Sequence, residues 1–133
     1  MRQLTDHIVP GDSANHQLTI EVTDQPGQGG ACHRYEVTGF DSTTNTSNDD
    51  KPYTVSKLTV LFQNGPIKEF GVNGTTQESL LAIVIDRLRS FQAGPFACEA
   101  NQFALDHCMA ALDNLQARTR ARIARGVEGT HQK

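Results

Sequence analysis

The chain has 133 residues, most simply a single domain, and its 15 acidic and 12 basic side chains give a formal net charge of −3 at pH 7. This acidic balance argues against general nucleic-acid binding, which usually needs a basic face, so we expect no DNA partner. The sequence holds no run of about 18 apolar residues, so we also expect no membrane span.

The first seven residues lack the apolar core of a signal peptide, which makes the cytosol the default location. After them, apolar and polar residues alternate, as in half-buried strands. A further short strand is predicted over residues 67–72, after the turn 64–66. Because hairpin-length connections cannot make parallel pairs, we expect an antiparallel sheet of about four strands. The three clearer period-two runs are Leu18, Ile20 and Val22, then Tyr35 and Val37, then Leu58, Val60 and Phe62.

Two loops separate these predicted strands. The first is rich in glycine, and its residues Gly29, Gly30 and Ala31, with Arg34 nearby, could cradle a phosphate through backbone amides. A plain strand connector is the better explanation, since glycine loops are common, and this loop lacks the lysine and the following helix of a nucleotide-hydrolysing loop. The second loop, residues 41–52, is almost wholly Ser, Thr, Asn and Asp, which predicts a mobile hairpin tip.

The second half of the chain predicts a helical hairpin. Thr75 and Glu78 have the spacing of a capping box before a helix from Gln77 to about Gln92. Six consecutive apolar residues, 80–85, wrap more than one face of this helix, so we expect the sheet and something else to cover it. Gly94 and Pro95 break the helix. We therefore predict one α+β domain over 1–133, with a sheet part (7–73), a helical hairpin (74–126) and a tail (127–133).

The second helix is predicted from about residue 97 to residue 125, where Gly126 follows as a stop. At roughly 43 Å it would be much longer than the first helix, so its far end would overhang any partner within the chain. Dimerisation through the helices is the natural use of that overhang. The stripe expected to pack closely consists of Ala97, Ala100, Ala104, Cys108, Ala111, Leu112 and Leu115.

Four of the basic residues lie within eight positions near the end of this helix: Arg118, Arg120, Arg122 and Arg125. All except Arg120 fall on one helical face. They could be a solvated helix end whose cations complement the helix dipole. The choice of arginine over lysine favours an alternative, because guanidinium groups match phosphate oxygens two at a time. The cluster therefore indicates a small anionic ligand held at one place.

The turn between the helices carries Phe91 and Phe96, and Asn101 follows. Phe96 is expected to seal the hairpin, but an aromatic ring near an amide can also stack a base and bind its edge. Asn101 and Arg118 are 17 residues apart on one helix, hence about 25 Å. One small ligand can touch both only if the helices of two chains pair.

The sequence gives little support to catalysis or metal binding. Cys32 and Cys108 each adjoin a histidine, but neither pair has a C-x-x-C partner, so we expect no metal. The three cysteines, Cys98 included, are interpreted as reduced thiols. No nucleophile stands at a catalytic spacing from a base, so we expect a binding protein, not an enzyme, and no cofactor.

These residues together resemble a known family. The strings 62–67, 71–74 and 80–91, and above all 117–131 with its arginines, are similar to the phage Thoeris anti-defence family, type one. The helical hairpin of that family is shared with the anti-CBASS cyclic-nucleotide sponges of phages. The resemblance covers roughly residues 7–131, and the arginine string is its most specific part.

The resemblance implies a non-catalytic sponge in the host cytoplasm that binds glycocyclic ADP-ribose, an immune signal, and withholds it from its effector. The pocket of the family lies at a homodimer interface, and its residues correspond here to Phe91, Asn101, Arg118 and Arg122. Some members are trimers of dimers, hence hexamers, and hold cyclic oligonucleotides at a second site, for which Gly29, Gly30, Ala31 and Arg34 are the candidates. An interaction module that blocks a host protein directly is the alternative.

Overall fold

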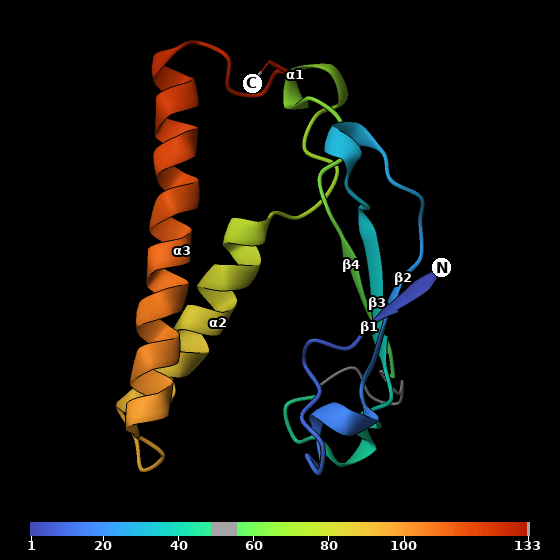
Figure 1. Cartoon of the computed structure of the whole chain (residues 1–133), viewed down its shortest axis with the longest axis vertical. Helices are drawn as coiled ribbons and strands as arrows, with labels where there is room; N and C mark the ends of the chain where they lie inside the picture. The colour runs from blue at the N-terminus through green and yellow to red at the C-terminus, as the bar shows by residue number, and fades with distance from the viewer. Residues whose placement is uncertain (49–55, 133) are drawn as a thin grey trace. The chain divides into compact units, whose positions relative to one another are not determined.

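The computed structural model describes residues 1–48 and 56–132. The chain divides into two compact units, Met1–Asn64 and Gly65–Lys133. The first holds the sheet and the second holds the helices, so the expected α+β class is confirmed (Figure 1). The expectation of a single domain over 1–133 stays a prediction.

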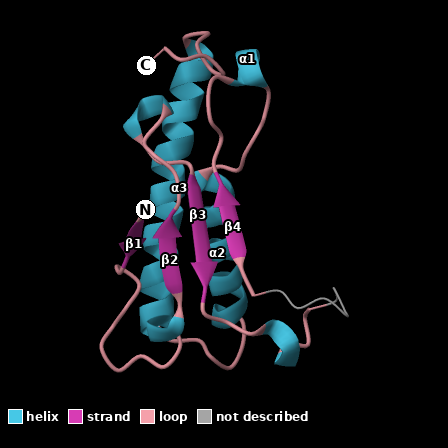
Figure 2. Cartoon of the chain, turned by 90° about the vertical axis from the view of Figure 1, so that its right-hand side faces the viewer, coloured by secondary structure: helices cyan, strands magenta, loops and turns pink. Residues whose placement is uncertain are grey.

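The first unit is an antiparallel sheet whose four strands lie in chain order (Figure 2). They are β1 (Arg2–Leu4), β2 (Thr19–Val22), β3 (Arg34–Thr38) and β4 (Leu58–Leu61). The three runs of alternating residues in the sequence are therefore confirmed as β2, β3 and β4. Val22 at the end of β2 pairs with Tyr35 of β3 and is only 1% exposed, which places the most buried side chain of this unit at that end of the sheet.

The prediction of a strand over residues 67–72 was wrong, because Ile67–Phe70 form a single helical turn, α1. Pro66 holds a φ of −64° and its carbonyl accepts hydrogen bonds from the amides of Glu69 and Phe70, so the turn starts directly after it. Gly71 then ends it at a φ of +71°. The fourth strand of the sheet is β1 instead, a three-residue strand too short to show periodicity.

The second unit contains the predicted hairpin, formed by α2 (Gln77–Gln92) and α3 (Glu99–Ala124). The capping box is one residue further along than predicted, and Thr76 rather than Thr75 is the N-cap. Its hydroxyl accepts from the Ser79 amide at 3.1 Å, and the Ser79 hydroxyl accepts from the Thr76 amide at 3.3 Å. Ser79 therefore takes the place in the capping box that the sequence pattern assigned to Glu78.

Helix α3 has a row of residues that are shielded from solvent, and beside it an outward row of exposed alanines. Leu105, Cys108, Leu112 and Leu115 are buried or half-buried, and they follow each other at three-to-four spacing. The alanines of the predicted stripe, 100, 104 and 111, are exposed, and residue 97 lies before the helix. The predicted stripe therefore lies along one side of the helix, but only its Cys108, Leu112 and Leu115 are shielded from solvent.

The polar stretch that was expected to form a mobile tip begins with a short turn, η3 (Ser42–Thr44), capped by the Asp41 carboxylate. Residues 49–52 of the expected tip lie outside the described residues. The mobility of the stretch stays a prediction.

Candidate functional site

Phe91 and Asn101 both lie at the hairpin turn, from opposite helices. The ring of Phe91, in the last turn of α2, meets the ring of Phe96 edge to face, with centroids 6.3 Å apart. The Asn101 amide, in the first turn of α3, donates to the Phe96 carbonyl at 3.3 Å. The structure thus brings the predicted aromatic and amide groups to one end of the hairpin, where they flank the same residue.

Arg87 belongs to the same cluster, although its part was not expected. Its guanidinium carbon lies 4.8 Å from the centre of the Phe91 ring, a cation–π arrangement between residues one helical turn apart. The i,i+4 spacing of Arg87 and Phe91 was visible in the sequence and could have indicated it.

The turn that presents this cluster is fixed by Gln92. The side-chain amide of Gln92 accepts from the Cys98 backbone amide at 3.0 Å and donates to the Cys98 carbonyl at 3.1 Å. It also donates to the side chain of Gln102 at 3.2 Å. One side chain therefore closes the loop between the helices, and no sequence pattern predicted this.

The four clustered arginines have different surroundings. Arg118, Arg120 and Arg125 are exposed, and Arg118 forms no ion pair or hydrogen bond through its side chain with any residue in 1–48 or 56–132. Arg122 is only 8% exposed. An open guanidinium and a buried one thus lie one turn apart on the helix.

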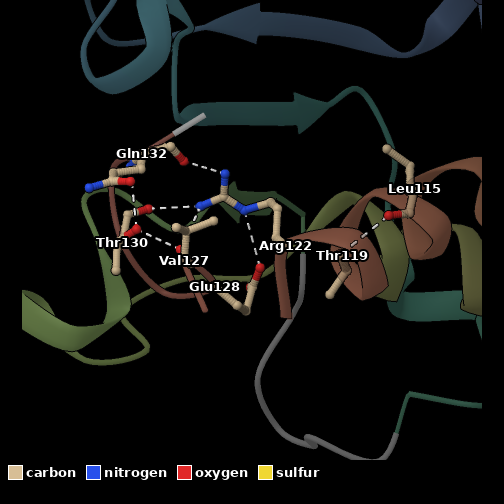
Figure 3. Close-up of polar contacts among 7 residues, drawn as sticks. All are labelled: Leu115, Thr119, Arg122, Val127, Glu128, Thr130 and Gln132. Atoms are coloured by element: carbon tan, nitrogen blue, oxygen red, sulfur yellow. Dashed lines mark hydrogen bonds and ion pairs between the residues drawn. The ribbon is translucent and has the colours of Figure 1, made fainter. Parts of the chain in front are cut away.

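The Arg122 guanidinium holds the C-terminal segment in place (Figure 3). It donates to the carbonyl oxygens of Val127 and Thr130 at 3.0 Å each, and to that of Gln132. Its Nε donates to the Glu128 carboxylate at 3.3 Å. Four of its five N–H groups therefore have acceptors within the segment that follows the helix.

The C-terminal segment is also tied to α1. The Lys68 amide donates to the Gly129 carbonyl at 3.0 Å, and His131 lies 3.9 Å from the Glu69 carboxylate. Figure 1 shows the C-terminus beside α1. Arg122 therefore has a structural task in this chain, whatever it contributes to a ligand.

The two groups of predicted site residues lie toward opposite ends of one continuous helix. Asn101 is in the first turn of the 26-residue α3, and Arg118 and Arg122 are near its end. The rise of a helix separates Asn101 from Arg118 by about 25 Å along the axis. The structure does not bring the four residues together within one chain.

The glycine loop borders a pocket of about 340 Å³ in the first unit. Gly30 and Ala31 line it, together with Arg2, Asp24 and Tyr35, among others. Arg34 is not part of the lining, because its guanidinium pairs with Glu36 at 2.7 Å and donates to the Thr23 hydroxyl at 2.8 Å. Arg2, from β1, supplies a guanidinium to the lining of this pocket, and no sequence pattern predicted that.

Asp24 shapes the same loop. Both of its oxygens accept from the backbone amide of His33, and one also accepts from that of Arg34, at 2.9–3.1 Å. Desolvation pushes the pKa of Asp24 upward, but these backbone hydrogen bonds outweigh it and the net pKa is below the ordinary 3.8. A charged carboxylate therefore holds the start of β3 at neutral pH.

The cysteine–histidine pairs do not form a cluster. In the part of the chain that the structure describes, no three His, Cys, Asp or Glu side chains lie close enough together to hold a metal ion. Cys32, Cys98 and Cys108 are free thiols.

In residues 1–48 and 56–132, no helix combines the length and apolar character needed to span a bilayer.

The fold and this geometry define an α+β protein whose second unit is a helical hairpin with an aromatic–amide cluster at its turn. Residues 56–120 match the model of the Acb2/Tad1 hairpin domain. A relative from Bacillus phage SBSphiJ7, Thoeris anti-defense 1, is 46% identical over 83 residues. That match covers 62% of this chain and 58% of the relative, so the chain spans less than two thirds of the relative's length. These two matches confirm the resemblance to the Thoeris anti-defence family that was drawn from the sequence.

Proposed function

We propose that the protein is a non-catalytic phage anti-defence sponge, which binds cyclic nucleotide immune signals in the host cytoplasm and withholds them from Thoeris or CBASS effectors. The preferred ligand is glycocyclic ADP-ribose, bound by Phe91, Asn101, Arg118 and Arg122. The match to the hairpin domain and the name of the phage relative support an anti-defence role.

The observation that carries the proposal is the separation of Asn101 and Arg118 along α3. A base stacks at the turn on Phe91, with Asn101 at its edge, and Arg118 meets the phosphates. Because about 25 Å of helix lies between these groups, a second, antiparallel copy of the hairpin must supply the arginine. The site is thus shared by a homodimer, which can assemble further into a trimer of dimers.

Arg122 contributes to this site by holding the C-terminal segment that follows α3. Four of its N–H groups are occupied by that segment, which leaves one for a ligand. Arg118 has all five of its N–H groups open among the described residues. Arg118 is therefore the direct phosphate ligand, and the effect of Arg122 is largely exerted through the C-terminal segment.

A second site for cyclic oligonucleotides is proposed at the pocket beside Gly29, Gly30 and Ala31. Gly30, Ala31 and Arg2 line this pocket, so backbone amides and a guanidinium would be available to an anion there, while Arg34 pairs with Glu36 and Thr23.

The first experiment is a calorimetric titration with glycocyclic ADP-ribose, followed by heating to release the ligand for chemical analysis. We expect tight binding and recovery of the intact ligand; a cleaved product would show that the protein is an enzyme. Arg118→Ala should abolish binding, and Arg120→Ala, on another face of the same helix, should not. Retained tight binding by Arg118→Ala would refute the assignment of the pocket.

A mixing experiment tests whether two chains share the site. Asn101→Ala and Arg118→Ala are each expected to bind poorly alone. In a mixed dimer, one of the two sites combines an intact turn from one chain with an intact Arg118 from the other. Co-expression should therefore restore binding at about a quarter of the sites if pairing is random. No recovery would place the whole site within one chain.

The alternative function is a hairpin that blocks a host protein directly. Ile83 and Val84 on the outer side of α2 favour it, since they are 66% and 44% exposed. Under that alternative no cyclic nucleotide would raise the melting temperature, and Ile83→Asp would abolish inhibition without affecting nucleotide binding.

A further inference from the structure

Among the described residues, Arg87 is a cation without a carboxylate partner. It is exposed, and no carboxylate in residues 1–48 or 56–132 forms an ion pair with it, although Asp86 is its neighbour in sequence. Its guanidinium carbon lies 4.8 Å from the centre of the Phe91 ring. The ring thus holds the guanidinium in position but does not neutralise its charge.

A guanidinium packed on a ring is prepared for an anionic or aromatic ligand. It has already lost part of its rotational freedom, so less entropy remains to be lost on binding. Its N–H groups point outward in the guanidinium plane and can reach phosphate oxygens. Nucleic-acid bases also stack on guanidinium planes, as they do on aromatic rings.

We propose that Arg87 is a further ligand-binding residue of the hairpin-turn site, which reads the phosphate beside the stacked base. The inference rests on the proposed function, because it assigns a role within the same site. A dinucleotide-type ligand carries a charged phosphate pair close to its base. Arg118 of a second chain meets that pair from the far side, and Arg87 meets it from the side of Phe91.

Arg89 provides a matched control on the same helix. It too is an exposed arginine of α2, so its loss changes the net charge by the same amount. Its guanidinium approaches the Met109 sulfur at 3.9 Å and not the aromatic cluster. A general loss of positive charge therefore affects both arginines equally, whereas a specific contact affects Arg87 alone.

The test is a titration of glycocyclic ADP-ribose into wild type, Arg87→Ala, Arg87→Lys and Arg89→Ala, at low and at moderate salt. Arg87→Ala should weaken binding about 10- to 100-fold and make it less sensitive to salt. Arg87→Lys should recover only part of the affinity, because the planar contact with Phe91 is lost. Arg89→Ala should stay within about threefold of wild type, and the melting temperatures of all variants should agree.

The outcomes separate this inference from the proposed function. If wild type binds, Phe91→Ala does not, and Arg87→Ala behaves like Arg89→Ala, the role of Arg87 is refuted and the proposed function stands. If wild type itself fails to bind, both are overturned. A fall in affinity for Arg87→Ala that is accompanied by a matching loss of folding stability would also refute a direct contact.

Discussion

Arg122 should be needed for folding stability, whereas Arg118, one helical turn earlier, should not. Arg122→Ala removes a buried guanidinium that donates to three backbone carbonyls and the Glu128 carboxylate. Hydrogen bonds with a charged partner contribute about 1.5–3 kcal/mol each, but these four act as one unit. Once the segment detaches, its carbonyls regain water, which limits the total. We therefore expect the free energy of unfolding to fall by about 2–4 kcal/mol, which overlaps the range of about 3–5 kcal/mol for removing one partner of a buried ion pair.

The measurement is urea unfolding at pH 7, followed by the helical circular dichroism signal at a fixed protein concentration. With a denaturant slope of about 2 kcal/mol/M, the midpoint should fall by about 1–2 M. Arg122→Met is a useful second variant, since it keeps the apolar stem and loses only the donors. Arg118→Ala should stay within about 0.5 kcal/mol of wild type, as substitutions of exposed residues usually do.

Hydrogen exchange supplies a local readout for the same prediction. The Lys68 amide is bonded to the Gly129 carbonyl, so it should exchange faster in Arg122→Ala if the segment detaches. Equal midpoints for Arg122→Ala and Arg118→Ala, with unchanged exchange at Lys68, would refute the view that Arg122 holds the C-terminal segment.

Three further predictions follow from single contacts. Gln92→Ala should lower the free energy of unfolding by about 1–2 kcal/mol, because the loop loses both hydrogen bonds to Cys98. A urea midpoint equal to that of wild type would contradict this. Gly39→Ala should lower the free energy of unfolding by over about 3 kcal/mol, since a Cβ would lie 2.0 Å from the Gln17 carbonyl oxygen. Gly29→Ala, where a Cβ meets no atom within 4 Å, should lower it by only about 1–2 kcal/mol, through backbone strain. Equal thermal stability of the two variants would show that backbone strain alone determines the loss. The pKa of Asp24 is lower in the folded state than in the unfolded state, so ionised Asp24 stabilises the fold. This stabilisation is fully present above the unfolded pKa of about 3.9 and is lost as the pH falls through the lower folded pKa. Unfolding midpoints from pH 5 to 2.5 should therefore fall less steeply in Asp24→Asn than in wild type, and parallel curves would contradict the assignment.

The parts of the fold that sequence could predict are those in which a repeating pattern extends over several residues. The period-two runs of β2 to β4 and the helical periods on either side of Gly94-Pro95 identify the sheet and the hairpin. The short elements β1 and α1 were missed for the opposite reason. Three or four residues cannot display a period, and the choice between a strand and a helical turn at Ile67–Phe70 depends on Pro66 and its carbonyl.

The candidate site was predictable only in part, because spacing gives the face of a helix but not what lies against that face. The helical period correctly predicted that Arg118 and Arg122 lie one turn apart on the same side of a helix. It could not show that the chain turns back after Gly126 and brings three carbonyls onto Arg122. For Arg87, the spacing to Phe91 was sufficient to indicate the cation–π contact, but only the folded structure shows that no carboxylate in residues 1–48 or 56–132 pairs with it.

The outward row of α3 gives an independent reason to expect a second copy of the hairpin. Residues 100, 104 and 111 are exposed alanines at helical spacing, and the larger Cys108, Leu112 and Leu115 beside them are half-buried. Small side chains let two helix backbones approach closely. An antiparallel approach along this row would bring the turn of one hairpin toward the arginine end of the other. In such a pair, Asn101 of one chain would lie close to Arg118 of the other, although the two residues are far apart within each chain. A variant with Ala104→Glu should therefore lose ligand binding by preventing association, although it alters no residue assigned to the ligand; light scattering that shows an unchanged assembly would refute the argument.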